Sequence, residues 1–506
     1  MRKTSSVFTI SAIIAVVFVI WGALAPQQLE AVSTSVQTFL EAQFGWFYLI
    51  SATVFLLFCV FLIFSRFGKI KLGKDDEEPE YNTFSWFAML FSAGMGIGLV
   101  FWGTAEPLSH LNNPPFGDAN SEQAAKLALR YSFFHWGLHP WGIYTLIALA
   151  LAYFKFRKGA PGVISATFYP LLGDRVKGPL GKTIDVIAVF ATVFGVATSL
   201  GLGAIQINGG LSFLYNGIPN SVGTQFLIIA GVTILFMLSA ISGLGRGIKW
   251  LSNTNLTIAF ILMLFVLFLG PTNFLMKIFT STLGGYLENL PAMSFRLAPF
   301  NSTHSQWIKD WTIFYWSWWI AWSPFVGTFI ARVSRGRTVR EFILGVLLVP
   351  TIFSAIWFAV FGGTGINLDL LQNGHIWQTM GKGDHVEVAL FAVLQQFPLS
   401  TFMSLLAILL ISTFFITSAD SATFVLGMQT TNGMLNPPAT VKIVWGVIQS
   451  ASAAVLLWSG GLQGLQTASI VAAFPFTFIL ILMMFSLYKA FKNEPIQKSK
   501  RKHDVA

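Results

Sequence analysis

Apolar runs long enough to cross a lipid bilayer recur along the entire sequence. Each is about 17–25 residues long, which is the length that a helix needs to cross a hydrocarbon layer roughly 30 Å thick. Since backbone groups in lipid must hydrogen-bond within their own segment, we expect these runs to be helices and not the strands of a barrel. We count twelve of them, near residues 7–25, 45–65, 84–105, 131–154, 184–204, 224–244, 253–271, 310–332, 341–362, 399–428, 439–458 and 465–488.

The placement of basic residues gives an independent test of this topology. Charged residues make up only 10% of the chain, whereas a soluble domain carries roughly 25%. With twelve spans and a cytoplasmic N-terminus, the outer loops hold only six of the 31 Lys and Arg residues, as the positive-inside rule predicts. These six are Lys126, Arg130, Lys277, Arg296, Lys309 and Lys382. The net charge of +10 therefore reflects membrane topology and does not indicate a nucleic-acid surface.

The chain is predicted to be a single polytopic transmembrane domain, residues 1–506, with short cytoplasmic tails at about 1–6 and 490–506. The first run is not a cleavable signal peptide, because it is long and no A-x-A-like site follows it. The stretch 280–297 is apolar but interrupted by glycine and proline, which favours a helix lying on the outer surface. We expect a protein of the bacterial inner membrane with both termini in the cytoplasm.

Two of the runs carry residues that interrupt a helix in mid-membrane. The third contains AGMGIG (Ala93–Gly98), and the eighth contains Ser323-Pro324 and then Gly327. Interrupted helices at matching positions in two halves are typical of transporters built on inverted repeats. The halves here would be runs 3–7 and 8–12, with runs 1 and 2 as additions. The alternative is that these glycines only allow helices to pack closely.

Aromatic residues gather in the eighth run, WTIFYWSWWIAWSPFVGTF, residues 311–329. At helical spacing, one stripe of it holds Trp311, Tyr315, Trp318, Trp322, Phe325 and Phe329, with Trp319 at its flank. Interfacial belts account for the outer end of the stripe but not for tryptophans near the midplane. The fourth run adds Trp136, Trp141 and Tyr144. Because aromatic faces attract cations, the pattern predicts a cage for a quaternary ammonium group, which has no N–H to donate.

Ionisable residues are scarce within the runs, and this narrows the cargo. Asp420 lies in the tenth run, while Glu106, Asp185 and Asp310 are placed near the ends of theirs. A simple cation would need a buried acid beside it, whereas a zwitterion brings its own anion, for which an opened third helix offers N–H donors. The sequence therefore favours a zwitterionic betaine.

Three further patterns complete the chemistry that the residues suggest. In TSADSA, Thr417 and Ser418 offer hydroxyls for sodium, although such groups often bond their own helix backbone. His135 and His139 are spaced as metal ligands on one helix, but no third ligand is evident, and packing between helices is favoured. Neither a phosphate-binding loop nor a catalytic constellation is present, so we expect no enzyme and no cofactor other than sodium as a coupling ion.

Four segments together resemble the betaine/choline/carnitine transporter (BCCT) family over nearly the whole chain. They are AGMGIGLVFWGTAEPL, HWGLHPWGIY, the tryptophan segment with the ARVSRGRTVREF that follows it, and TSADSA. The resemblance implies an all-α membrane fold of twelve helices with a LeuT-type five-plus-five inverted-repeat core, helices 3–7 and 8–12, and two extra N-terminal helices. It also implies assembly as a homotrimer.

The resemblance also implies roles for individual residues. The aromatic box would be Trp136, Trp141, Tyr144 and Trp319, with Trp318 and Trp322 beside it and with Ala93, Met95 and Phe101 completing the site. The sodium ligands would be Ser92, Met95, Phe414, Thr417 and Ser418. A second sodium site would use Thr192, Phe325 and Phe329, but Val196 stands where that pattern needs another hydroxyl. Choline-type members carry an aspartate where Gly98 stands, and carnitine-type exchangers place a basic side chain near the sodium position, which runs 5 and 10 lack.

These patterns predict sodium-coupled symport of glycine betaine for osmoprotection. The alternatives are uptake of choline, carnitine, proline or ectoine, sodium-independent exchange of betaine and carnitine, and a channel. The expected partners are a small zwitterionic solute, sodium and membrane lipid, and no nucleic acid. The basic C-terminal tail either flanks the last helix or contacts anionic lipid.

Overall fold

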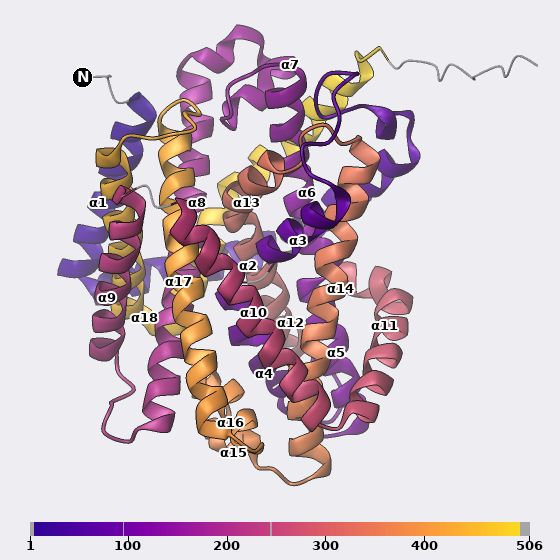
Figure 1. The fold of residues 1–506 in the computed structure, drawn as a ribbon, viewed down its shortest axis with the longest axis vertical. Coiled ribbons are helices and arrows are strands. Elements are labelled where there is room, and N and C mark those ends of the chain that lie inside the picture. Colours follow the sequence, from indigo (N-terminus) through magenta and orange to yellow (C-terminus); the bar gives the residue numbers. More distant parts are fainter. Residues whose placement is uncertain (1–4, 95, 243–244, 496–506) are drawn as a thin grey trace, which may run out of the picture.

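Long helices make up almost all of the regular structure in the computed structural model, which describes residues 5–94, 96–242 and 245–495 (Figure 1). Within these ranges the only pairing of extended chain is one isolated bridge between Lys71 and Thr338. Nine helical segments in the described part are long and apolar enough to cross a membrane. They are Ser6–Leu24, Pro26–Phe64, Glu122–Arg157, Pro179–Leu214, Val222–Ile241, Trp250–Leu269, Val339–Leu371, Ser400–Thr430 and Ala439–Lys492. The all-helical membrane fold is thus confirmed.

The difference between nine segments and twelve predicted spans has identifiable sources. Helix α18 (Ala439–Lys492) has 54 residues, or about 80 Å at 1.5 Å per residue, and non-helical angles at Gly460 and Gly461 divide it between the two predicted final runs. The third run is divided into two short helices, and α13 (Phe314–Arg332), although it has 19 residues like α1, is less apolar because of its tryptophans and polar residues. The count of twelve and the inverted repeat remain predictions.

The predicted opening of the third run is confirmed. Helix α3 (Thr83–Gly94) ends just before α4 (Ile97–Asn112) begins, and Gly96 between them is extended, with φ −160° and ψ −178°. The amide groups of the first turn of α4 therefore have no helical partners upstream. This interruption lies where the sequence placed it, within Ala93–Gly98.

The eighth run is different, because the expected interruption at Pro324 is wrong. Helix α13 continues through this residue. Since proline has no N–H, the carbonyl of Ile320 loses its usual helical partner. The hydroxyl of Ser323 donates to that carbonyl at 2.8 Å and replaces the missing bond.

An interruption that the sequence did not predict lies in the fourth run, between α5 (Glu122–Trp136) and α6 (Leu138–Ala152). Gly137 adopts φ −100° and ψ −130°, and a Cβ there would lie 2.4 Å from the Phe133 carbonyl oxygen. The amide of Leu138 donates to the Tyr286 hydroxyl at 3.1 Å, so the freed backbone is satisfied by a neighbouring helix. Two of the predicted box residues, Trp136 and Trp141, therefore stand on separate half-helices.

Other boundaries shift by longer distances. Helix α2 (Pro26–Phe64) begins far before the predicted 45–65, so the expected loop between the first two runs is helical. The remaining long helices are α1 (Ser6–Leu24), α8 (Pro179–Leu214), α9 (Val222–Ser242), α10 (Gly245–Leu269), α11 (Thr272–Ser294), α14 (Val339–Ile366) and α17 (Ser400–Thr430). Helix α11 covers most of the stretch predicted to lie on the outer surface, and that location stays a prediction.

Helix α13 lies at the centre of the bundle and packs against α6, α8 and α18. Its Tyr315, Trp316 and Trp318 are almost completely buried. By contrast, α9 exposes Leu227, Ile234 and Leu238, as expected of a surface that faces lipid. The core therefore holds the aromatic segment, while apolar side chains also cover the outside.

Candidate functional site

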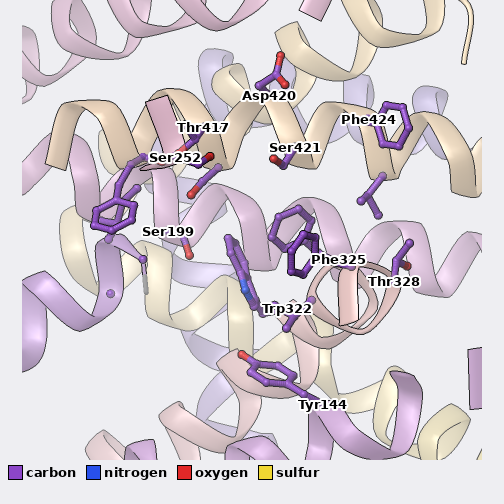
Figure 2. Close-up of a pocket in the computed structure, with 18 of the residues that line it drawn as sticks. Tyr144, Ser199, Ser252, Trp322, Phe325, Thr328, Thr417, Asp420, Ser421 and Phe424 are labelled. Carbon is purple, nitrogen blue, oxygen red and sulfur yellow. Dashed lines mark hydrogen bonds between the residues drawn. The ribbon is translucent and has the colours of Figure 1, made fainter. Parts of the chain in front are cut away.

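A cavity of about 760 Å³ lies between α4, α6, α13 and α17. It extends to Leu435 and Asn436 in the connection between α17 and α18. The end of α17 is close to Ser5, whose hydroxyl donates to the Thr430 carbonyl. Figure 2 shows Tyr144 and Trp322 on one side of the cavity, with Thr417 and Ser421 of α17 across from them. Its volume is in the usual range for a small-molecule site.

The four residues of the predicted aromatic box all line this cavity. The rings of Trp136 and Trp319 have centroids 4.8 Å apart at an interplanar angle of 74°. Trp141 and Tyr144 meet at 5.3 Å and 79°, and Tyr144 and Trp319 at 6.2 Å and 77°. Because the rings stand nearly perpendicular to one another, they form the corners of a box and do not stack into a solid layer.

Trp318 and Trp322 also line the cavity, as does Gly98. Trp318 stacks on Trp319, with centroids 4.6 Å apart. A Cβ at Gly98 would lie 2.5 Å from Trp318 Cη2 and 3.1 Å from Trp136 Cη2. Glycine at this position therefore allows α4 to approach two indole rings. Phe101 does not line the cavity; its ring instead packs against Trp102, with centroids 4.8 Å apart.

The opposite wall is formed by α17 and is polar. Phe414, Thr417 and Ser418 all line the cavity there. The Thr417 hydroxyl lies 3.0 Å from the carbonyl oxygen of Thr413 and 3.2 Å from that of Phe414, either of which accepts its hydrogen, and it accepts a hydrogen bond from Asn255 Nδ2 at 3.3 Å. Two of the predicted sodium ligands are therefore adjacent, and uncharged oxygens of this kind suit sodium.

The remaining predicted ligands do not all meet at the cavity. Met95 lies outside the described residues, and nothing is described of the side chains of Ser92 and Ala93. Phe325 and Phe329 line the cavity, but Thr192 does not. The hydroxyl of Thr192 is bonded to the Ala188 carbonyl at 2.8 Å and to Gln429 Oε1 at 3.2 Å. The structure thus does not gather the three residues of the predicted second sodium site.

A buried carboxylate behind the box was misplaced by the sequence. Glu106, expected near the end of its run, is fully buried within α4. Its Oε2 accepts hydrogen bonds from Trp136 Nε1 at 2.8 Å and from the Tyr315 hydroxyl at 2.6 Å. Its Oε1 lies 2.7 Å from His135 Nδ1 and 3.2 Å from His110 Nε2. The only local signal was the spacing of Glu106 and His110 by one helical turn.

Glu106, His110 and His135 also offer three ligand atoms within 4.8 Å of one another. Two ligands on one tetrahedral metal ion, each at about 2.1 Å, lie roughly 3.4 Å apart. The 2.7 Å between Glu106 Oε1 and His135 Nδ1 is instead the length of a charge-assisted hydrogen bond. His139 does not join the group and stacks on Trp316 at 5.1 Å, so the expected packing role fits it.

Comparison with known proteins decides the class to which this cavity belongs. Residues 6–496 match the family described as "BCCT, betaine/carnitine/choline family transporter". The chain belongs to this BCCT family. It is 57% identical over 495 residues to the glycine betaine transporter OpuD of Bacillus subtilis, covering 98% of this chain and 96% of that protein. The family and its similar members are transporters and not enzymes.

Other BCCT relatives show that similarity alone leaves the cargo open. A probable glycine betaine transporter of Desulfitobacterium hafniense is 47% identical, over 97% of this chain and 98% of the relative. An ectoine/hydroxyectoine transporter of Virgibacillus pantothenticus is 48% identical, over 95% of each. Two cargo names thus occur at nearly equal identity, and the choice depends on the chemistry of the cavity.

Proposed function

We propose that this BCCT protein couples sodium entry to the uptake of glycine betaine, and that it serves osmoprotection from the bacterial inner membrane with both termini in the cytoplasm. The observation that carries this proposal is the aromatic box on the wall of the cavity. Sodium bound at α17 would stabilise the conformation that accepts betaine, and transport would proceed by alternating access. Sodium-independent exchange is the alternative that the experiment below must exclude.

The box offers ring faces to the cargo, while two of its N–H groups are bonded elsewhere. Trp136 Nε1 donates to Glu106, and Trp319 Nε1 donates to the His135 carbonyl at 2.9 Å. A trimethylammonium group has no N–H and cannot accept a hydrogen bond, so ring faces are what recognise it, at about 0.5–2 kcal/mol per ring. This arrangement supports a quaternary ammonium cargo over an amine.

The carboxylate of the cargo has a complementary site at the opened helix. Gly96, Ile97 and Leu99 line the cavity at the start of α4. The N-terminus of a helix attracts anions, because its first amides are free and its dipole is positive there. A carboxylate at α4 would place the ammonium group of betaine, one methylene away, toward Trp136 and its neighbours.

Ectoine is a second candidate, favoured by the similarity to the ectoine/hydroxyectoine transporter. Its cyclic amidinium is also a delocalised cation beside a carboxylate, and aromatic faces attract it as well. It differs from betaine in carrying N–H donors. Competition of unlabelled ectoine and unlabelled glycine betaine against labelled betaine ranks the two cargoes.

Three wider features belong to the proposal: a homotrimer, which the family resemblance implies, a single transmembrane domain, and a role for the basic tail. The protein would act as a homotrimer in membrane lipid, as one transmembrane domain over residues 1–506. The basic tail residues Lys498, Lys500, Arg501 and Lys502 lie outside the described residues. Crosslinking in native membranes tests the trimer, and comparing osmotic activation after deletion of residues 490–506 tests a role for the tail.

Uptake of radiolabelled glycine betaine into proteoliposomes tests substrate and coupling ion together. We expect accumulation above the external concentration under an inward sodium gradient, and none when potassium replaces sodium. Accumulation of equal size without sodium would reject coupling. If the protein accumulates ectoine but not betaine, ectoine becomes the substrate, and sodium-coupled transport remains the mechanism.

A further inference from the structure

We propose that Glu106 is a positioning residue for cargo specificity, which orients the aromatic box and raises its attraction for a cation by accepting the indole N–H of Trp136 from behind the ring. This inference rests on the proposed function, since it takes the box as the site of the ammonium group. Glu106 is the acidic residue of the segment GTAEP in α4, and its side chain does not line the cavity itself.

The Glu106 carboxyl is surrounded by four polar atoms. A carboxylate has about four lone-pair positions and is an acceptor only when ionised. Trp136 is a donor only, and with the Tyr315 hydroxyl and two histidine nitrogens it directs four polar atoms at these positions. When His110 Nε2 and His135 Nδ1 both carry hydrogen, all four positions face donors, and such partners offset the cost of burying the anion.

The carboxylate reaches two of the four box rings through its partners. Trp136 lines the cavity and is held directly by its bond to Glu106. Trp319 is held indirectly, because its N–H donates to the carbonyl of His135, whose ring bonds Glu106. Tyr315 stacks on Trp319 at 5.8 Å and 21°. Glu106 thus controls the angle between the rings of Trp136 and Trp319, which meet at one corner of the box.

An electrostatic effect follows from the same contact. When an indole N–H donates to an anion, the face of the indole ring becomes more negative. Cation–π attraction depends on that negative face. The negative charge of Glu106 also acts from a fully buried position behind the Trp136 ring, where screening is weak. The cavity is therefore influenced by two acids, because Asp420 of α17 lines it and Glu106 lies directly behind the wall residue Trp136.

The competing explanation is that Glu106 has a purely structural role, and an experiment distinguishes this from a role in cargo specificity. Glu106→Gln is compared with wild type for equilibrium binding of labelled glycine betaine at saturating sodium. We expect the betaine Kd to rise by about tenfold, with little change in the sodium concentration that half-saturates transport. A general loss of both affinities, or an unchanged betaine Kd in a folded variant, would overturn the proposal.

Two tryptophan variants show whether the effect passes through Trp136. Trp136→Phe and Trp141→Phe remove the same atoms from two box residues, but only Trp136 bonds Glu106. We expect Glu106→Gln to have little further effect on Kd in the Trp136→Phe background and its full effect in the Trp141→Phe background. Equal effects in both backgrounds would contradict the assignment.

The design also covers variants that fail to assemble. If Glu106→Gln does not fold, the single variants carry the test, and Trp136→Phe must weaken betaine binding more than Trp141→Phe. Equal losses would overturn the proposal. If wild type itself does not bind betaine, the proposed function fails; if wild type binds and only the Glu106 effect is missing, the positioning role alone fails.

Discussion

The two walls of the cavity recognise charge in different ways. The wall of α5, α6 and α13 presents aromatic faces, and the N–H groups of Trp136 and Trp319 are bonded away from the cavity. The wall of α17 presents the Thr417 hydroxyl and the Phe414 carbonyl from neighbouring turns of one helix, and the acidic Asp420 also lines the cavity there. The aromatic wall therefore depends on long-range contacts among several helices, whereas the polar wall depends on local helix geometry. This difference suits a soft organic cation on one side and a small hard cation on the other.

The largest effect is expected when the aromatic wall loses the ring at its centre. Trp319→Ala removes the ring that meets Trp136, Tyr144 and Trp318. We expect the betaine concentration for half-maximal uptake to rise by about 100-fold or more, from lost cation–π attraction and a looser box. Trp458→Ala is the matched control, because Trp458 lies on α18 and is 54% exposed. Unchanged uptake by Trp319→Ala would remove the cage assignment.

The polar wall should show the opposite dependence. Thr417→Val keeps the shape and removes the hydroxyl near the Phe414 carbonyl. We expect the sodium concentration for half-maximal uptake to rise by about tenfold, which corresponds to one lost ligand, while betaine affinity at saturating sodium changes little. Thr413→Val serves as the control, since its hydroxyl bonds the Leu409 carbonyl and does not line the cavity. An unaltered sodium dependence would mean that α17 does not bind the coupling ion.

Gly98 lies on α4 beside the rings of Trp318 and Trp136, and a smaller effect is expected when it is replaced. Gly98→Ala places a Cβ 2.5 Å from Trp318 Cη2, so the indole must move. We expect betaine affinity to fall by roughly threefold to tenfold, the effect of modest overpacking. Gly231→Ala is the control, because nothing lies within 4 Å of its added Cβ. If Gly98→Ala binds betaine as well as wild type, the close approach of α4 is not needed for recognition.

The smallest effect on transport is expected from an ion cluster outside both walls. Glu494 accepts hydrogen bonds from Tyr153 at 2.7 Å and Arg157 at 2.9 Å, and it also pairs with Lys158. Burial raises the pKa of Glu494, but the hydrogen bonds from Lys158, Tyr153 and Arg157 outweigh it and hold the pKa below its usual 4.5. The carboxylate therefore stabilises the fold above pH 4.5, and this contribution is lost as the pH falls through the lower folded pKa.

Glu494→Gln should accordingly lower the thermal midpoint in detergent by about 3 °C at pH 7. The difference from wild type should shrink as the pH falls below 4.5, because the wild-type carboxylate is then protonated. Betaine affinity should stay unchanged. A difference in thermal midpoint that is constant with pH would show that the ion cluster does not act through its charge.

The four residues of the aromatic box, which the family resemblance named, all line the cavity. Helical spacing in α13 also placed Trp318, Trp322, Phe325 and Phe329 there, but Trp311 and Tyr315 of the same stripe do not line it. The opening at Gly96 was predicted because glycines weaken a helix in mid-membrane. Pro324 was misjudged because the compensating bond from Ser323 to Ile320 cannot be read from propensity. Gly137 was missed because a single glycine gives a weak signal, and its partner Tyr286 is distant in sequence.

The charged centre of the site was less predictable. Glu106 gains its role from Trp136 on α5 and Tyr315 on α13, 30 and 209 residues away. Nothing in the sequence around Glu106 shows which helix it will face. Thr192 shows the converse, because its hydroxyl bonds Gln429, which lies 237 residues away on α17, and does not reach the cavity.

Recognition of the positive charge by the aromatic wall is the central claim, and an isostere of the cargo with an uncharged carbon in place of the ammonium nitrogen tests it most directly. In 3,3-dimethylbutanoate a carbon replaces the nitrogen of glycine betaine, so the shape and the carboxylate stay while the positive charge is lost. The measurement is displacement of labelled betaine from purified protein at saturating sodium. We expect the isostere to bind at least about 100-fold more weakly than unlabelled betaine, because ring faces no longer attract it. Displacement at similar concentrations would show that the box recognises shape, and would contradict the account.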